Sequence, residues 1–210
     1  MAHKNNLILR ILSTFLMAPI VLLTVYFGGN SFNILLIFIL LVGLYEILQI
    51  KKFFFRFIIL LLFISFLFSC FELRNLQNGK NHLFLLIIIT WLSDMGGYFF
   101  GKYIGGKKIN FISPNKTYIG FLGSILFVLL SIIFINNTNI NFSDNILKNY
   151  LLLIFGSFLV IIGDLLFSFF KRKTGVKDFS NIIPGHGGLF DRIDGMIILT
   201  IVYYIFVKNL

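Results

Sequence analysis

The sequence predicts an all-α integral membrane protein with about seven transmembrane helices. Of its 210 residues, 58% are hydrophobic and 12% are charged, about half the charged fraction of an ordinary soluble domain. A water-soluble fold of this size has no interior large enough for so many Phe, Ile and Leu side chains. The solvent for most of the chain must therefore be lipid.

The spans follow from the length of each apolar run, because a spanning helix needs about 20 mostly apolar residues. The first run follows Lys4 and Arg10 as a secretory signal does, but it is long and lacks a clean cleavage site, so we expect an uncleaved helix. The next five runs each approach the required length between more polar connections, whereas the last is short for a span. The candidate spans are residues 7–27, 33–50, 54–71, 82–100, 119–135, 150–170 and 195–207.

The basic residues predict the orientation of these spans. With the N-terminus placed in the cytoplasm, fourteen of the 18 Lys and Arg residues fall on the inner side. This distribution favours an odd number of spans with the C-terminus outside. The net charge of +10 also suggests an anionic partner such as lipid headgroups, nucleotide phosphates or nucleic acid.

Carboxylates are scarce, with only eight Asp and Glu residues in the chain. A carboxylate within a spanning helix is costly and by default marks a functional site. Asp94 and Asp164 lie inside or at the inner end of predicted spans, so both are candidates. Glu46 lies near the end of the second span, and we expect it to reach toward Lys51 or Lys52 in a structural role.

Three polar residues recur on one face of the sixth span. Asp164, Ser168 and Lys171 are separated by four and three positions, which places them on the same side of a helix. A buried ion pair that only holds helices together would give the same pattern. The polar loop that follows favours a site.

That loop, residues 171–194, combines basic residues, glycines and carboxylates. Glycines let the backbone approach a ligand closely, and basic side chains bind phosphates through charge-assisted hydrogen bonds. Asp191 and Asp194 are three positions apart and, with Asp164, form a set of oxygen ligands suited to Mg²⁺, with room for a second cation. His186 is more suited to a phosphate than to Mg²⁺. A loop that served only as a topology signal would not need these carboxylates.

A second polar segment covers residues 93–120. Gly97 and Gly101 have the spacing of close helix packing. Ser113 and Pro114 predict the start of a helix, near which Lys116 or Thr117 would reach a phosphate.

Together these motifs resemble the signature of the phosphatidate cytidylyltransferases, the CDP-diacylglycerol synthases. The similarity covers about residues 90–206. It differs at Ile119, where the family usually has Glu before the glycine, and at Gly97, where it usually has Ala. The chain is also shorter than many members, which predicts fewer N-terminal spans. The motifs that carry the resemblance consist of Asp94, Gly96, Gly97 (the departure just named), Tyr98, Ser113, Pro114, Lys116, Thr117, Ser168, Lys171, Arg172, Lys177, Asp178, Pro184, His186, Gly187, Gly188, Asp191, Arg192 and Asp194.

The resemblance implies transfer of a cytidylyl group from CTP to phosphatidic acid, with release of pyrophosphate. Residues 1–80 would then be N-terminal transmembrane helices and residues 81–210 the catalytic membrane region. It implies a multi-pass protein of the bacterial inner membrane with its active site on the cytoplasmic side, a possible homodimer, and no nucleic-acid partner. We expect Asp164, Asp191 and Asp194 to bind metal, with Lys171 and Ser168 in catalytic roles. Substrate would be bound by Asp94, Lys116, Thr117, Arg172, Lys177, Asp178, His186, Gly187, Gly188 and Arg192.

Three other interpretations remain open. A CTP-dependent lipid-alcohol kinase would need a base to activate a hydroxyl and would release CDP. A transporter would place its polar residues near the midplane of the membrane, whereas here they gather at the cytoplasmic ends. A degenerate paralogue would bind the nucleotide without turning it over, which the residue at position 119 allows.

Overall fold

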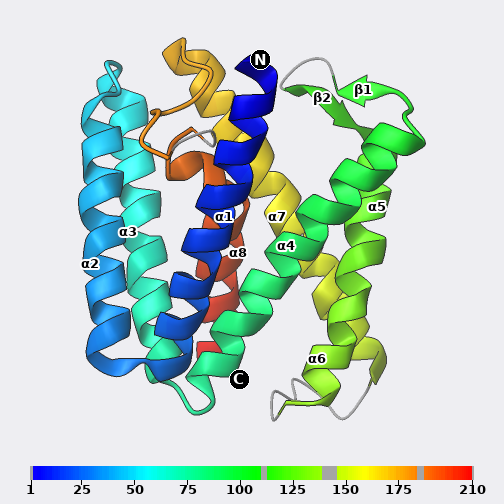
Figure 1. The fold of residues 1–210 in the computed structure, drawn as a ribbon. Helices are drawn as coiled ribbons and strands as arrows, with labels where there is room; N and C mark the ends of the chain where they lie inside the picture. Colours follow the sequence, from blue (N-terminus) through cyan, green and yellow to red (C-terminus); the bar gives the residue numbers. More distant parts are fainter. Residues whose placement is uncertain (1, 110–112, 139–145, 184–186, 210) are drawn as a thin grey trace.

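The computed structural model describes residues 2–109, 113–138, 146–183 and 187–209, and it is dominated by long helices (Figure 1). Each predicted span coincides with helical structure. The helices in chain order are α1 (Ala2–Phe27), α2 (Gly29–Leu48), α3 (Phe53–Asn75), α4 (Gly79–Tyr103), α5 (Tyr118–Val128) continued by the 3-10 turn η1 (Leu129–Ser131) and α6 (Ile132–Asn136), α7 (Ile146–Thr174) and α8 (Phe190–Lys208).

The helices are consistent with an all-α membrane protein. Among the described residues, five segments are long and apolar enough to cross a membrane, namely α2, α3, α4, the continuous stretch Tyr118–Asn136, and α7. The apolar part of α1 that is described, Phe15–Phe27, is shorter, and α8 is not one of the five. The count of seven spans therefore stays a prediction.

The connections α2–α3, α4–α5 and α7–α8 gather at one end of the bundle (Figure 1). This polar end comprises residues 49–52, 104–117 and 175–189 in the part of the chain that is described, and the N-terminus lies there too. The C-terminus lies at the opposite end. Opposite termini agree with an odd number of crossings, while the side of the membrane that each faces stays a prediction.

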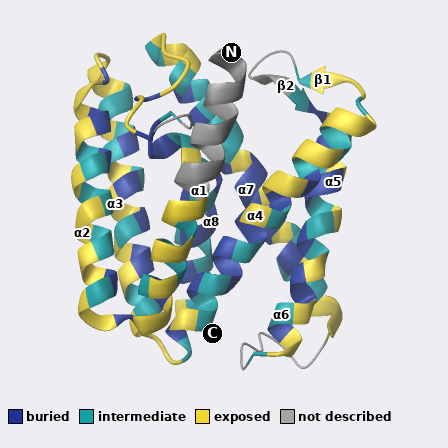
Figure 2. Ribbon diagram, in the orientation of Figure 1, coloured by how far each residue is buried: buried dark blue, intermediate teal, exposed yellow. Residues whose placement is uncertain are grey.

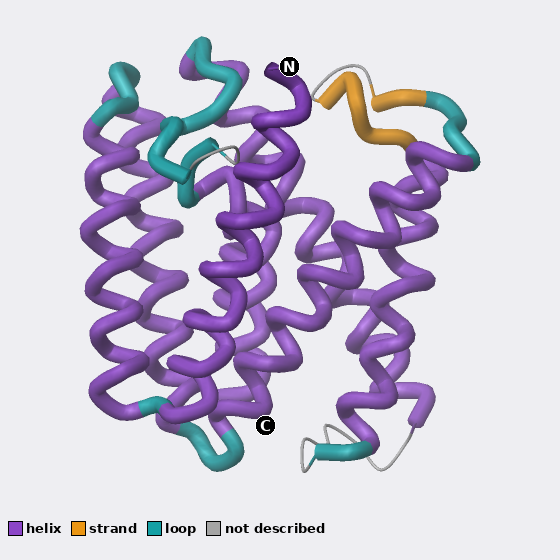
Figure 3. The backbone as a smooth tube through the Cα atoms, in the orientation of Figure 1, coloured by secondary structure: helices purple, strands orange, loops and turns teal. Residues whose placement is uncertain are grey.

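The connection from α4 to α5 is a small hairpin and not only a loop (Figure 3). Strand β1 (Lys108–Ile109) pairs antiparallel with β2 (Ser113–Thr117), with Lys108 opposite Thr117. The predicted helix start at Ser113 and Pro114 is therefore wrong. The helix begins at Tyr118, because Thr117 is the residue that caps it: its hydroxyl accepts a hydrogen bond from the Gly120 N–H at 3.0 Å.

Helix α8 lies at the centre of the fold and contacts α3, α4 and α7. Its Ile197 and Leu199 are buried, as are the facing α3 residues Ile59 and Phe63. The outer surfaces of α2 and α3 instead expose large apolar side chains (Figure 2), which is the pattern expected of helices that contact lipid. Because α3 packs against α8, the core continues across the boundary predicted at residue 80.

Helices α4 and α5 approach each other at backbone distance. A Cβ at Gly96 would overlap the carbonyl of Gly123, and one at Gly123 would lie 2.5 Å from the carbonyl oxygen of Gly96. The prediction that Gly97 and Gly101 serve close packing is confirmed, since both lie against the start of α5, where Cβ atoms would meet the Ser124 hydroxyl and the cap of α5 at 2.9 and 3.3 Å. This contact fixes the hairpin relative to α4.

Candidate active site

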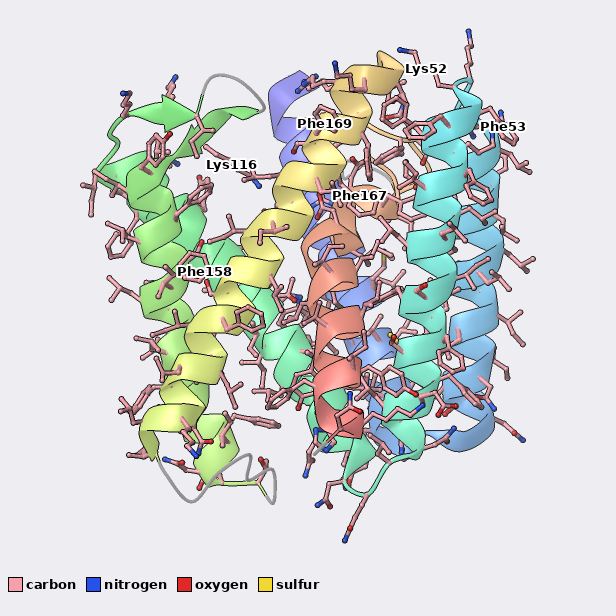
Figure 4. All side chains as sticks on the ribbon, turned by 180° about the vertical axis from the view of Figure 1, so that it is seen from behind. Lys52, Phe53, Lys116, Phe158, Phe167 and Phe169 are labelled. Carbon is pink, nitrogen blue, oxygen red and sulfur yellow. The ribbon has the colours of Figure 1, made fainter. Side chains whose placement is uncertain are left out.

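An ion pair joins the hairpin to α7 at the polar end. The Lys116 ammonium lies 2.6 Å from Oδ2 of Asp164, and the two side chains are 28% and 22% exposed. Figure 4 shows the Lys116 side chain extending from the hairpin toward α7. The structure therefore brings together the two polar segments that the sequence marks, around residues 94–120 and 164–194.

Two further carboxylates surround Asp164. Asp194, in the first turns of α8, lies within electrostatic reach of Asp164, Lys116 and Lys171. Asp94 of α4 lies within reach of Asp164, Lys116 and Arg192. Asp164 also borders Gly195, where a Cβ would lie 3.2 Å from its Oδ1. Four elements, α4, β2, α7 and α8, thus direct opposite charges to one place.

A pocket of about 220 Å³ opens beside this cluster, between α4, α5 and α7. Asp94, Lys116 and Asp164 line it together with Tyr98 and the hydroxyl-bearing Ser93. The Ser93 hydroxyl is buried and has no hydrogen-bond partner among the described residues. No role is predicted for Ser93 from the sequence, and its place directly before Asp94 near the end of an apolar run is the signal that could have indicated one.

A second ion pair holds the loop that precedes α8. The Lys171 ammonium lies 2.8 Å from Oδ1 of Asp191, and these side chains are only 14% and 4% exposed. The other oxygen, Oδ2, accepts hydrogen bonds from the backbone N–H groups of Phe179 at 3.1 Å and Gly188 at 2.9 Å. Asp191 therefore anchors the loop to α7 with both of its oxygens.

Glu46 does not reach toward Lys51 or Lys52, and that expectation is wrong. Its carboxylate is completely buried and binds Ser180 and the backbone at the start of α8. Lys51 and Lys52 are exposed, and Lys52 instead donates to the backbone carbonyl of Lys173 at the end of α7. The sequence does not reveal the true partners because they lie more than 130 positions away.

The other residues predicted to bind substrate lie around these two ion pairs. Thr117 lines the pocket, but its hydroxyl also caps α5. Ser168 is half-buried on α7 between the two paired residues of that helix. The Gly187 carbonyl accepts a hydrogen bond from the Ile183 N–H at 2.9 Å, and its φ of +83° is the left-handed conformation that favours glycine.

The remaining predicted residues lie on the surface of the polar end or beyond the description. Arg172, Lys177 and Asp178 are exposed, at the end of α7 and in the loop. Arg192 is exposed on the first turn of α8. His186 lies outside the described residues, so its role stays a prediction.

The site offers oxygen ligands of the kind that Mg²⁺ prefers, although not as a complete cage. Asp164 and Asp194 are neighbours. Asp164 accepts a hydrogen bond from Lys116 at Oδ2, and Asp194 accepts one from the Gly195 N–H at Oδ1, whereas both oxygens of Asp191 accept hydrogen bonds within the loop and from α7. Among the described residues, no three His, Cys, Asp or Glu side chains come close enough to hold a metal ion by themselves. Mg²⁺ commonly takes one or two carboxylates and completes its shell with substrate phosphates and water. Asp164 and Asp194 fit that pattern.

Comparison with known proteins assigns the chain to a family. A model of the cytidylyltransferase family matches residues 49–210, which include the hairpin, α7 and α8. A protein of Staphylococcus haemolyticus (strain JCSC1435) is 40% identical over 122 residues, which is 56% of this chain and 45% of the relative. A protein of Bacillus subtilis (strain 168) is 39% identical over 140 residues, 64% of this chain and 51% of the relative.

A third relative, from Aquifex aeolicus (strain VF5), is 33% identical over 192 residues, which is 91% of this chain and 71% of the relative. All three relatives carry the name phosphatidate cytidylyltransferase. The chain spans about half the length of the first two. The matched segment covers most of the chain and contains every charged residue of the two ion pairs, and the chain belongs to the cytidylyltransferase family.

Proposed function

We propose that this protein transfers the cytidylyl group of CTP to phosphatidic acid. An oxygen of the lipid phosphate attacks the α-phosphorus of CTP, a new P–O–P linkage forms, and the bond from the α-phosphorus to the bridging oxygen breaks. The products are CDP-diacylglycerol and pyrophosphate. The names of the relatives support this substrate pair.

The observation that carries the proposal is the meeting of Lys116, Asp164 and Asp194 beside a pocket at one end of an apolar bundle. The nucleophile is already an anion at neutral pH, so the reaction needs no strong general base. It needs alignment of the reactants and neutralisation of phosphates that repel each other. Among the described residues, the site has opposed charges and no Ser-His-Asp arrangement, which agrees with that requirement.

The basic side chains of the site are proposed to hold phosphates. Lys116 is paired with Asp164 and can exchange that partner for a phosphate oxygen, forming a charge-assisted hydrogen bond. Arg172, Lys177 and Arg192 are exposed at the polar end, where a nucleotide arriving from water would meet them. Lys171 is proposed to act mainly through the loop, because its ammonium already binds Asp191.

Mg²⁺ is proposed as the cofactor, held by Asp164 and Asp194 together with phosphate oxygens of CTP. Such an ion would withdraw charge from the phosphates and favour departure of pyrophosphate. The Asp191 carboxylate is proposed as the anchor of the loop in this state, and its predicted role as a metal ligand remains to be tested. A second cation near Asp94 is part of the same hypothesis.

We further propose that the polar end faces the cytoplasm, where CTP is available, and that the protein resides in a bacterial inner membrane. The excess of Lys and Arg in the connections at that end supports this orientation. Phosphatidic acid would then reach the pocket from the adjacent leaflet. A homodimer remains part of the proposal and has no bearing on the chemistry above.

The test is incubation of the purified protein with labelled CTP, phosphatidic acid and Mg²⁺. We expect labelled CDP-lipid and equimolar pyrophosphate, and we expect Asp164→Asn to lower the rate by at least about a hundredfold. Glu72→Gln, at the other end of α3, serves as the matched control and should keep the wild-type rate. In a parallel incubation with a lipid alcohol in place of phosphatidic acid, release of CDP with a phosphorylated alcohol would instead identify a lipid-alcohol kinase. Binding of CTP without turnover would identify an inactive paralogue.

A further inference from the structure

A buried carboxylate from α2 holds the start of α8. Glu46 lies within the last turn of α2 and is 0% exposed. Its Oε1 accepts hydrogen bonds from the Ser180 hydroxyl at 2.7 Å and the Leu189 N–H at 2.6 Å, while its Oε2 accepts one from the Phe190 N–H at 3.1 Å. The charge is buried but is directed at hydrogen-bond donors.

These donors are the backbone groups that a helix start leaves unsatisfied. The first N–H groups of any helix have no carbonyl partner within it, and they carry the positive end of the helix dipole. No side chain of the N-cap residue Leu189 supplies the missing acceptor. Glu46 supplies it from a different helix, and its negative charge suits that end of the dipole.

Glu46 and Asp191 divide the donors of one short segment between them. Asp191 accepts from Gly188, and Glu46 accepts from the next two residues. There is no room for a larger residue between them, because a Cβ at Gly188 would lie 2.6 Å from Oε1 of Glu46. The segment is therefore tied to α7 through Lys171 and to α2 through Glu46.

Aromatic packing holds the same segment against α3, α7 and the loop. Phe190 stacks on Phe167 of α7 with ring centroids 5.9 Å apart, and it also contacts Phe63 of α3 and Phe179 of the loop. Phe190 is completely buried, so these contacts restrain its side chain, while Glu46 restrains its backbone N–H. The two carboxylates are the groups that hold the backbone N–H groups at the start of α8, ahead of its backbone contact with α7 at Gly163.

From these contacts we infer that Glu46 is a positioning residue, which orients Arg192 toward the site by fixing the first turn of α8. The effect of Glu46 on catalysis rests on the proposed cytidylyl transfer. Its contacts with the loop and α8 are observed whatever the reaction is. Glu46 precedes the segment that matches the family, which begins at residue 49. The N-terminal helices would thus contribute to the site as well as to the membrane anchor.

The test compares Glu46→Gln and Ser180→Ala with Glu72→Gln, a half-buried acid on α3 at the other end of the bundle. Backbone amide exchange, followed by mass spectrometry of peptides that cover residues 178–191, measures the contact directly. We expect Glu46→Gln to speed amide exchange in this segment by about tenfold. A factor of ten in the opening equilibrium corresponds to about 1.4 kcal/mol, which lies within the cost of leaving one buried N–H without its acceptor. Exchange in α4 should stay unchanged. Ser180→Ala leaves the carboxylate in place and should have a smaller effect.

Steady-state kinetics measure the consequence for the site. We expect Glu46→Gln to raise the KM for CTP by about tenfold, because the first turn of α8 carries a residue proposed to bind its phosphates. The KM for phosphatidic acid should change by less than about twofold. A variant that merely lost folded protein would lower the rate and leave both KM values unchanged.

The outcomes separate this inference from the proposed function. Unchanged exchange in residues 178–191 would overturn the inference whatever the wild-type activity. Faster exchange with an unchanged KM for CTP would reduce Glu46 to a stabilising residue and would also overturn it. Wild-type protein that makes no CDP-lipid would refute the proposed function, while the exchange result would still report on Glu46.

Discussion

The ion pair between Lys171 and Asp191 should couple the loop to α7 by about 3 kcal/mol. Its two atoms are 2.8 Å apart, and its side chains are 14% and 4% exposed. Breaking a buried pair by removing one partner costs about 3–5 kcal/mol, and the residual access of water to Lys171 places the value at the lower end, about 3 kcal/mol. For a chain of about this length, 1 kcal/mol shifts the melting temperature by about 2–4 °C. Asp191→Asn should therefore lower it by about 6–12 °C.

The chain provides its own reporter for this measurement. Cys70 is the single cysteine of the sequence and is buried in α3, so a thiol-reactive fluorophore reacts with it only as the bundle unfolds. Asp191→Asn, Lys171→Met and the double variant complete a double-mutant cycle in detergent. Asp178→Asn is the matched control, since it alters an exposed carboxylate on the same loop and should shift the melting temperature by less than about 2 °C.

The double variant decides whether the reasoning is correct. If the pair is coupled, it should be little less stable than either single variant, because the second substitution removes a charge that the first has already left unpaired. If the stability loss of the double variant equals the sum of the two single losses to within about 0.5 kcal/mol, the two residues act independently. The loop would then be held by Glu46 and by the ring contacts among Phe167, Phe179 and Phe190, without a contribution from this pair.

Three further predictions follow from contacts described above. Gly123→Leu should destabilise the bundle by more than about 3 kcal/mol because its side chain meets the backbone of α4, and Gly123→Ala should have a smaller effect in the same thiol assay. Thr117→Val removes the cap of α5 and should cost about 1 kcal/mol, while Thr117→Ser should restore it; equal melting temperatures for the two would contradict the cap. Lys116→Met should lower kcat/KM for CTP by at least about tenfold, with partial recovery in Lys116→Arg, and a wild-type value would exclude Lys116 from phosphate binding.

The scarcity of charge made part of the site predictable from sequence. In a chain with so few carboxylates, Asp94 and Asp164 stand out within apolar spans, and the structure brings them together with Lys116. Asp164, Ser168 and Lys171 do lie on one helix, α7, but its two charged residues pair with different elements, Asp164 with β2 and Lys171 with α8. The roles of these residues in substrate binding stay predictions until variants are assayed.

Other features depended on contacts between distant parts of the chain. The burial of Glu46 requires the fold, because nothing near it in sequence distinguishes a side chain that reaches toward lysine from one that enters the core. The start of α5 was misplaced because Pro114 and Thr117 both resemble helix starts, and strand pairing with Lys108 decides between them. Asp191 shows a related limit, since its spacing to Asp194 does not reveal that its oxygens are engaged with backbone N–H groups.

The glycine contacts group α4, α5, α7 and α8 into two closely packed helix pairs. α4 and α5 touch through their backbones at Gly96 and Gly123, and α7 touches α8 where a Cβ at Gly163 would lie 2.6 Å from the Asp194 carbonyl oxygen. Close-packed backbones leave little freedom for sliding within each helix pair. Motion is easier along the seam between the helix pairs, which the Lys116–Asp164 ion pair crosses. A ligand that binds the Lys116 ammonium in place of Asp164 therefore also removes an ion pair between the two helix pairs.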